Sequence, residues 1–359
     1  MKRTYIIAEA GVNHNGSLAL AKELIEAASD AGADAIKFQT FRADKIVTLN
    51  AAKAAYQLTN TSADESQYDM LKKLELSYEQ HFELVHYAKE RGIQFLSTPF
   101  DLESADFLIG KLKLPVMKIS SGDLTNALLL LRISQGNIPV ILSTGMATLG
   151  EIEEALGVLA FGYAVSNRME PSIERFRQAY RSEKGQASLK QHVTLLHCTS
   201  EYPAPVNDVN LKAMLTLSHA FDLPVGYSDH TKGIAIPIAA AALGAQIIEK
   251  HFTLDKELPG PDHKASLDPA QLQEMIAAIR DVDQSLGGPL KLPAESELKN
   301  LEVSRKSLVT SKPVREGECF TSENLTVKRP GGGTQPMQYW RILGQKATRH
   351  YDADELVEL

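Results

Sequence analysis

The sequence predicts an α/β protein in which a (β/α)8 barrel of the TIM type is followed by a small β-rich domain. Short apolar segments rich in β-branched residues recur over roughly the first 280 residues, and amphipathic helical patterns separate them. Strands that alternate with helices form parallel sheets, and eight strands over this length match the usual size of a barrel. A doubly wound open sheet is the alternative, but no Gly-x-Gly-x-x-Gly motif follows the first predicted strand.

The predicted strands are short apolar runs that end in polar residues. They are Tyr5–Ala10, Ala35–Thr40, Gln94–Pro99, Val116–Ser120, Val140–Thr144, Val193–Thr199, Val225–Ser228 and Ile247–Phe252. Between them, Ser17 can cap a helix whose apolar residues fall on one face and which ends before Gly32. The segment Glu79–Arg91 repeats this pattern, and Gly92 marks its end. We therefore expect helices at both places.

Changes in composition divide the chain into three parts. Residues 1–286 hold the barrel pattern, residues 287–303 are a linker that opens on two glycines and a proline, and residues 304–359 form the β-rich domain. Within the last part, the runs Ser307–Thr310 and Leu325–Lys328 are predicted as strands. A domain of about 55 residues is marginally stable alone, so we expect it to dock on another surface.

Two segments of the barrel are longer than ordinary connections. Phe41–Leu76 has a polar stretch, Thr59–Gln67, that gives way to a helical pattern, and this segment is a candidate lid over the site. The charged insertion Gly162–Lys190 is predicted to be helical.

Composition narrows the function classes. The 359 residues are 43% hydrophobic and 23% charged, as in ordinary globular proteins, and the net charge of −7 argues against nucleic-acid binding. Cys198 and Cys319 are far apart and in no metal-type spacing, which fits a reducing compartment. The apolar run Ile234–Ile248 is interrupted by Pro237 and Gly244 and is too short for a membrane helix, so we read it as a buried helix and a strand. We expect a cytoplasmic enzyme without a membrane partner.

Chemically capable residues follow nearly every predicted strand, where a parallel barrel binds its ligands. One group consists of cations and hydroxyls that suit a phosphate or carboxylate: Lys37, Thr98, Lys118, Ser121 and Ser143. A second group consists of acids and imidazoles: Glu9, His230, Glu249, His251 and Asp262. Lysines in apolar strands are costly to bury as scaffold, so Lys37 and Lys118 are predicted to serve the site.

Two histidines are predicted to share a metal ion. His230 and His251 come from adjacent strands, so their imidazoles can meet, and such a pair suits a Lewis-acidic divalent ion. A lone strand histidine such as His197 is more often a structural hydrogen-bonding residue. Asp229 can orient His230, and Lys250 faces away from its neighbours Glu249 and His251, which favours a structural role.

Several longer motifs resemble those of the sialic acid synthase family. They are Ala8-Glu9-Ala10-Gly11-Val12-Asn13-His14-Asn15-Gly16, Ile36-Lys37-Phe38-Gln39-Thr40, Leu96-Ser97-Thr98-Pro99-Phe100, Ser143-Thr144-Gly145-Met146, His197 to Pro205, Gly226-Tyr227-Ser228-Asp229-His230-Thr231 and Ile248-Glu249-Lys250-His251-Phe252. The stretch Pro259–Leu267 looks like the branch that makes N-acetylneuraminate and legionaminate. The tail, with Val327-Lys328-Arg329-Pro330-Gly331, resembles the antifreeze-like (SAF, β-clip) domain of these synthases.

The resemblance implies a metal-dependent condensation of phosphoenolpyruvate with a 2-acetamido sugar aldehyde, with release of phosphate. By the same resemblance, phosphoenolpyruvate lies against Lys37, Gln39, Thr98, Lys118, Ser121, Ser143 and Ser228. Glu9, Tyr202 and Asp262 hold sugar hydroxyls, and Glu249, Lys118 and Glu9 are catalytic. His230 and His251 bind the metal, with Mn²⁺ expected and Mg²⁺ or Co²⁺ as alternatives. Arg329 reaches the partner's sugar in a domain-swapped homodimer.

The sugar is the open point of this interpretation. N-acetylmannosamine, giving N-acetylneuraminate, is the first expectation, and a 2,4-diacetamido-2,4,6-trideoxymannose, giving N,N'-diacetyllegionaminate, is the alternative. Some relatives carry asparagine where this chain has Ser200 on the sugar side, and an amide differs from a hydroxyl in reach. Two readings lie outside this mechanism: a Schiff-base aldolase using Lys118 or Lys37, and a non-catalytic sugar-binding or ice-binding protein.

Overall fold

The computed structural model of the chain describes residues 3–61, 65–165 and 169–358. By its internal contacts the chain divides into two compact units, Met1–Gly287 and Gly288–Leu359. Each unit has a hydrophobic core of its own.

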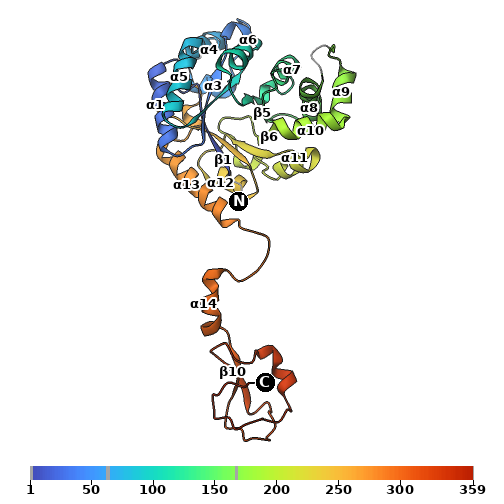
Figure 1. Cartoon of the computed structure of the whole chain (residues 1–359). Helices are drawn as coiled ribbons and strands as arrows, with labels where there is room; N and C mark the ends of the chain where they lie inside the picture. Colours follow the sequence, from blue (N-terminus) through green and yellow to red (C-terminus); the bar gives the residue numbers. More distant parts are fainter. Residues whose placement is uncertain (1–2, 62–64, 166–168, 359) are drawn as a thin grey trace. The chain divides into compact units, whose positions relative to one another are not determined.

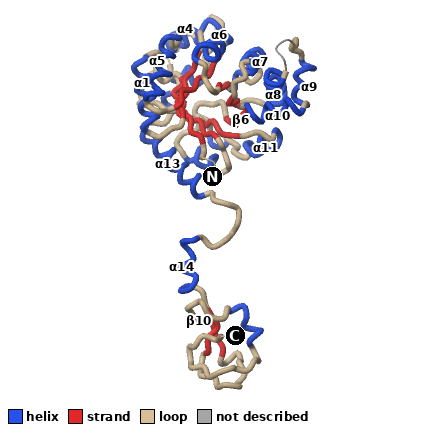
Figure 2. The backbone as a smooth tube through the Cα atoms, in the orientation of Figure 1, coloured by secondary structure: helices blue, strands red, loops and turns tan. Residues whose placement is uncertain are grey.

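The first unit is built on one eight-stranded parallel sheet surrounded by helices (Figures 1 and 2). Its strands are β1 (Tyr5–Gly11), β2 (Ala35–Thr40), β3 (Gln94–Pro99), β4 (Met117–Ile119), β5 (Val140–Ser143), β6 (Val193–Cys198), β7 (Val225–Asp229) and β8 (Ile247–His251). They follow the order β3-β2-β1-β8-β7-β6-β5-β4, and the two end strands, β3 and β4, also lie in contact. The predicted barrel is confirmed, and every predicted strand is present within one residue at each end.

Helices cover the outer face of this sheet (Figure 2). They are α1 (Leu18–Asp30), α5 (Tyr78–Glu90), α6 (Leu102–Phe107), α7 (Ala127–Gln135), α8 (Leu149–Ala164), α11 (Ala213–Phe221), α12 (Ala235–Ala242) and α13 (Pro269–Ser285). Ser17 caps α1 as predicted, since its side chain accepts a hydrogen bond from the backbone N–H of Leu20. On α5 the apolar Phe82 is 49% exposed, whereas His81 is fully buried.

The connections contain shorter helices. The predicted lid segment holds α2 (Ala43–Ile46), α3 (Ala55–Asn60) and α4 (Gln67–Leu74), and part of its polar stretch, residues 62–64, lies outside the described ranges. The insertion predicted to be helical contains α9 (Ile173–Arg181) and α10 (Glu183–His192), and its residues 166–168 also lie outside them. A π-helical turn lies at Leu108–Leu112, and 3-10 turns lie at Ser121–Asp123, Val206–Asp208, His263–Ala265 and Pro336–Gln338.

The barrel interior changes character along its axis. A separate apolar cluster inside it is made of Ile7, Ala35, Leu96, Ile141, Leu196 and Ile247. Successive residues of a strand face opposite sides of a sheet, so the residue two positions further along each strand also faces inward. Those positions hold Glu9, Lys37, Thr98, Ser143, Cys198 and Glu249. The interior is therefore apolar toward the start of the strands and polar at their carboxyl ends.

The second unit contains α14 (Glu295–Ser304), an antiparallel pair of strands, β9 (Ser307–Thr310) and β10 (Leu325–Lys328), and α15 (Tyr339–Ile342). Both strands have the bounds that the sequence predicts. The segment predicted as a linker is not wholly irregular, because α14 occupies its second half; none of the residues of α14 is buried. Within the described ranges, no helix has the length and apolarity that a membrane span requires.

Candidate active site

A cavity of about 650 Å³ lies at the carboxyl ends of the barrel strands. This volume is within the usual range of small-molecule pockets, roughly 300–1,000 Å³. Every predicted site residue of the first unit lines it: Glu9, Lys37, Gln39, Thr98, Lys118, Ser121, Ser143, Tyr202, Ser228, His230, Glu249, His251 and Asp262. Residues from all eight strands or the loops that follow them thus converge on one space.

Two lysines and two glutamates form a buried network of alternating charge. The Lys37 ammonium is paired with Glu9 and lies 3.8 Å from Glu249 Oε2. The Lys118 ammonium lies 3.5 Å from Glu249 Oε1. None of these side chains is more than 5% exposed. Each buried charge therefore has a counter-charge, which is the condition under which such groups are tolerated.

The two carboxyl groups differ in protonation. Burial raises the pKa of Glu9 to about 7, although Lys37 acts in the opposite direction. Burial acts to raise the pKa of Glu249 as well, but Lys118 and Lys37 outweigh it and lower that pKa below its usual value. Burial also lowers the pKa of Lys118. At neutral pH one carboxylate stays charged, while the other can take up or release a proton.

Hydroxyl groups surround these charges. Thr98 Oγ1 accepts a hydrogen bond from Lys37 Nζ at 3.2 Å, and Ser228 Oγ donates one to Glu249 Oε1 at 2.9 Å. Ser121 Oγ accepts from the backbone N–H of Gly145 at 3.0 Å. Ser143 Oγ is buried without a hydrogen-bond partner among the described residues. A buried hydroxyl with no protein partner is suited to a ligand oxygen.

The two histidines lie side by side. The ring centroids of His230 and His251 are 5.5 Å apart, and both side chains are buried. His230 Nδ1 lies 2.6 Å from the carbonyl oxygen of Thr199. A carbonyl can only accept, so Nδ1 carries the proton and Nε2 keeps a lone pair. Burial lowers the pKa of His230 and, more strongly, that of His251, so both imidazoles are neutral at pH 7.

This arrangement fits a divalent ion. His251 Nδ1 is buried without a hydrogen-bond partner among the described residues, and Asp262 Oδ2 is 3.9 Å away. In the described ranges, no three histidine, cysteine, aspartate or glutamate side chains are grouped to hold a metal. An ion on the two imidazoles would therefore fill its other positions with water and substrate oxygens.

An ion pair lies behind the histidines. Lys250 and Asp229 are fully buried, and their charged atoms are 2.5 Å apart. Asp229 also accepts hydrogen bonds from the backbone N–H of Thr231 and from the Tyr227 hydroxyl. His197, in contrast, has Nε2 2.6 Å from the carbonyl oxygen of Val209, as expected of a structural histidine.

The cavity has apolar lining residues that the sequence analysis missed. Most come from the predicted lid segment: Phe41, Ile46, Val47, Met70, Leu71 and Leu74, with Val12 and Phe100 from the loops after β1 and β3. The spacing of Met70 and Leu74 on a short amphipathic helix indicated one buried face, but not what that face lines.

Arg329 belongs to the second unit. Its Nε donates a hydrogen bond to the carbonyl oxygen of Ser304 at 3.1 Å, and the side chain is exposed. Its predicted contact with a partner's sugar stays a prediction.

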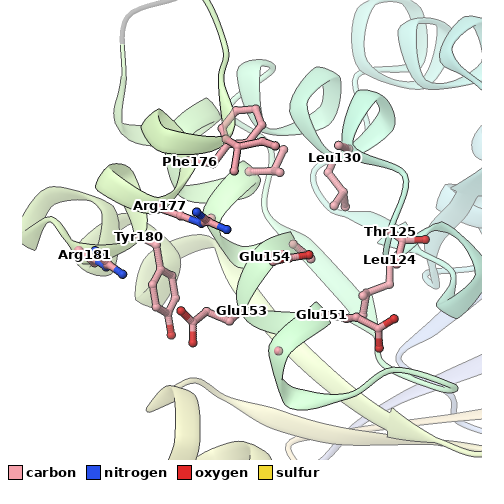
Figure 3. Close-up of a pocket in the computed structure, with 16 residues that line it drawn as sticks. Leu124, Thr125, Leu130, Glu151, Glu153, Glu154, Phe176, Arg177, Tyr180 and Arg181 are labelled. Atoms are coloured by element: carbon pink, nitrogen blue, oxygen red, sulfur yellow. The ribbon is translucent and has the colours of Figure 1, made fainter.

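A second cavity, of about 480 Å³, lies between α7, α8 and α9 on the outside of the barrel. Figure 3 shows Glu151, Glu153 and Glu154 on one of its walls and Phe176, Arg177 and Tyr180 on another. None of the predicted site residues lines it. The cavity at the strand ends is therefore the candidate active site.

The chain is similar to known proteins along nearly its whole length. The sequence matches the NeuB family over residues 24–291 and the SAF domain over residues 305–358. It is 52% identical to an N,N'-diacetyllegionaminic acid synthase of Campylobacter jejuni, with 99% of each chain covered. It is 45% identical to an enzyme of the same name from Legionella pneumophila, covering 97% of this chain and 92% of that one.

More distant relatives have other names. The human N-acetylneuraminate-9-phosphate synthase is 34% identical, with 98% of this chain and 91% of that one covered. Among solved structures, an N-acetylneuraminic acid synthetase from Leptospira borgpetersenii, in complex with citrate, superposes with a TM-score of 0.67 at 33% identity. That alignment covers 84% of this chain and 90% of the other.

Proposed function

Because the chain belongs to the NeuB family, we propose that it condenses phosphoenolpyruvate with 2,4-diacetamido-2,4,6-trideoxymannose to give N,N'-diacetyllegionaminate and phosphate. The chain is a transferase of the sialic acid synthase type. The choice of sugar is supported by the identity of 52% to a diacetyllegionaminic acid synthase along both chains, against 34% to the N-acetylneuraminate-9-phosphate synthase. This supports the alternative sugar rather than N-acetylmannosamine, the first expectation from the sequence.

Phosphoenolpyruvate carries a phosphate and a carboxylate, and the two buried lysines of the cavity can bind both. Lys37 and Lys118 are held at the cavity wall, and Thr98 and Ser143 offer hydroxyl groups beside them. With Glu9 protonated, the four ionisable groups of the network sum to one positive charge, which favours an anion. Bringing the anion close raises the pKa of Glu9 further, so binding and protonation support each other.

The reaction needs a cationic centre to be stabilised and protons to be moved. C3 of phosphoenolpyruvate bonds to the aldehyde carbon, which leaves positive charge at C2, and the charged Glu249 can stabilise that centre. Water adds at C2 and loses a proton, the new alkoxide gains one, and Glu9, with a pKa of about 7, can carry this proton. The C2–O bond to phosphate then breaks while the C2 hydroxyl passes its proton to the departing phosphate and becomes the keto oxygen.

The predicted metal would be held by His230 and His251. A bound Mn²⁺-type ion supplies Lewis acidity to the aldehyde oxygen. Tyr202, whose ring centroid is 4.2 Å from that of His230, and Asp262 would help to orient the sugar beside it.

Phosphate release with separate sugars tests the proposal. We expect release from phosphoenolpyruvate only when a sugar is present, with kcat/KM at least about tenfold higher for the diacetamido sugar than for N-acetylmannosamine. A preference for N-acetylmannosamine would overturn the choice of sugar. Sugar-independent release, or none with any sugar, would contradict the reaction.

The lowered pKa of Lys118 favours one rival, in which its neutral amine forms a Schiff base. Borohydride added during turnover would then trap an adduct on Lys118. We expect no adduct, loss of activity with a chelator and recovery with Mn²⁺. His251→Ala should abolish tight Mn²⁺ binding in equilibrium dialysis, and unchanged binding would refute the ligand assignment.

A further inference from the structure

The cavity has two chemically different walls. One, which we name the polar wall, carries the lysines, hydroxyls and imidazoles described above. The other, which we name the apolar wall, consists of Val12, Phe41, Ile46, Met70, Leu71 and Leu74. Four of these side chains, those of Val12, Phe41, Met70 and Leu74, form a buried cluster, while Ile46 and Leu71 pack against it and are half-buried.

The apolar wall is held firmly in place. Asn60 Nδ2 donates a hydrogen bond to the carbonyl oxygen of Pro261 at 2.8 Å, which ties the lid segment to the loop after β8. Glu75 Oε1 accepts from the backbone N–H of Ala43 at 2.7 Å and so joins the end of α4 to the start of α2. These bonds brace the segment that carries most of the wall, and a braced wall can discriminate between ligands by shape.

In the proposed function, the polar wall binds the reacting groups of the two substrates. In the proposed function the lysines and hydroxyls receive phosphoenolpyruvate, and the imidazoles lie at the aldehyde end of the sugar. The remaining carbons of the sugar, up to C6, must then occupy the rest of the cavity. The lining that is left includes polar residues such as Lys45, Asp123 and Asn126 as well as the apolar wall. Of these surfaces, the apolar wall is the one that suits apolar substituents on the part of the sugar that does not react.

The two candidate sugars differ in that part. The diacetamido sugar has a methyl group at C6 and an acetamido methyl on C4, where N-acetylmannosamine has two hydroxyl groups. Aliphatic and aromatic side chains bury methyl groups favourably, about 0.8 kcal/mol for each carbon, and leave a buried hydroxyl without a partner. Gln67, at the start of α4, also lines the cavity and can pair with the acetamido amide.

We propose that the apolar wall is the specificity subsite for the sugar, and that it selects a 6-deoxy carbon over a hydroxymethyl group. The inference rests on the proposed function for the position of phosphoenolpyruvate and the aldehyde. It adds the chemical reason for the choice of sugar.

The experiment compares three sugars in phosphate-release assays: the diacetamido sugar, N-acetylmannosamine, and 2-acetamido-2,6-dideoxymannose, which differs from N-acetylmannosamine only in lacking the C6 hydroxyl. We expect kcat/KM for the 6-deoxy sugar to exceed that for N-acetylmannosamine by about tenfold or more. This ratio tests the wall even if the diacetamido sugar proves not to be the substrate, so the two proposals can fail separately. Equal or reversed values for the 6-deoxy pair would overturn the subsite.

Variants test which residues make the preference. Leu71→Asn and Ile46→Asn should each reduce the 6-deoxy preference about tenfold or more while leaving the KM for phosphoenolpyruvate within about twofold. Leu71→Met keeps the wall apolar and should keep the preference. Leu58→Asn is the matched control, because Leu58 is 48% exposed on the same segment and does not line the cavity. A preference that survives both asparagine variants would refute the assignment, provided that circular dichroism shows them to be folded.

Discussion

The two buried lysines of the site have different surroundings. Lys37 is paired with both Glu9 and Glu249, whereas Lys118 is near Glu249 alone, at 3.5 Å. Removing Lys37 would leave Glu9 without its nearest cation, and breaking a buried pair in this way costs about 3–5 kcal/mol. Lys118 is therefore expected to contribute less to the stability of the folded protein than Lys37 does.

Substituting methionine for each lysine should separate its contribution to substrate binding from its contribution to stability. We expect Lys118→Met to raise the KM for phosphoenolpyruvate about tenfold or more with a small change in the free energy of unfolding. Lys37→Met should lower that free energy by several kcal/mol. Steady-state kinetics and urea denaturation measure the two effects, and equal destabilisation by both variants would contradict the pairing pattern.

A buried histidine makes stability depend on pH. His14 is 1% exposed, accepts a hydrogen bond from the backbone N–H of Gly16 at 3.0 Å, and has its pKa lowered by burial from 6.5 to about 3. Between these values the unfolded chain binds a proton that the folded protein does not, so stability falls as the pH falls below 6.5. Glu9, whose pKa is raised, acts in the opposite direction between pH 4.5 and 7.

His14→Asn isolates the histidine contribution, since the asparagine oxygen can replace Nδ1 as the acceptor. Between pH 7.5 and 5.5, the change in unfolding free energy should be about 1 kcal/mol more favourable in the variant than in the wild type. Denaturant titrations at both pH values measure the difference. An unchanged pH dependence would mean that His14 does not stay neutral in the folded protein.

Among the elements, β7 is directly followed by His230 and β8 ends with His251, the two predicted metal ligands. Asp229 and Lys250 are paired across these strands, and each directly precedes a histidine in the sequence. Their ion pair connects the strands immediately behind His230 and His251. It is therefore placed to hold the distance between the two imidazoles.

We expect Lys250→Met to weaken Mn²⁺ binding about tenfold or more, beyond its cost in stability. Arg280→Met is the control, because Arg280 forms a half-buried ion pair with Asp34, at 2.7 Å, away from the cavity. Mn²⁺ titrations followed by electron paramagnetic resonance report affinity independently of turnover. Equal Mn²⁺ affinities of the wild type and Lys250→Met would show that the ion pair stabilises the fold without affecting the metal site.

For the chain as a whole, the prediction to test is that the second unit contributes to catalysis. The resemblance predicts that Arg329 of one chain completes the sugar site of another. Arg329→Ala should then raise the KM for the sugar and spare that for phosphoenolpyruvate, whereas equal damage to both would point to a folding effect.

Mixing two variants tests the contribution between chains. Refolding Arg329→Ala together with His251→Ala should restore activity, because the mixed dimer has one site with both residues intact, roughly one site in four overall. Neither variant alone should reach this level. No recovery in mixtures shown by mass photometry to contain dimers would contradict the exchange.

The strands, their direction and the residues that face the cavity could be read from the sequence. The alternation of period two is local, so Lys37 and Gln39 had to share a face. The paired imidazoles of His230 and His251 were foreseen because consecutive strands of a parallel barrel are neighbours. Apolar character alone does not predict burial on α5, where Phe82 is 49% exposed and His81 is fully buried, because burial depends on which side of the helix meets the barrel.

The pairing of charges and the second wall came only with the folded arrangement. Nothing in the spacing of the chain says that Lys37 lies between Glu9 and Glu249, or that Met70 and Leu71 line the cavity that begins at Glu9. These contacts join residues far apart in the sequence, and closing the barrel decides which of them meet. Local periodicity determines which face a side chain takes, and long-range packing determines what it finds there.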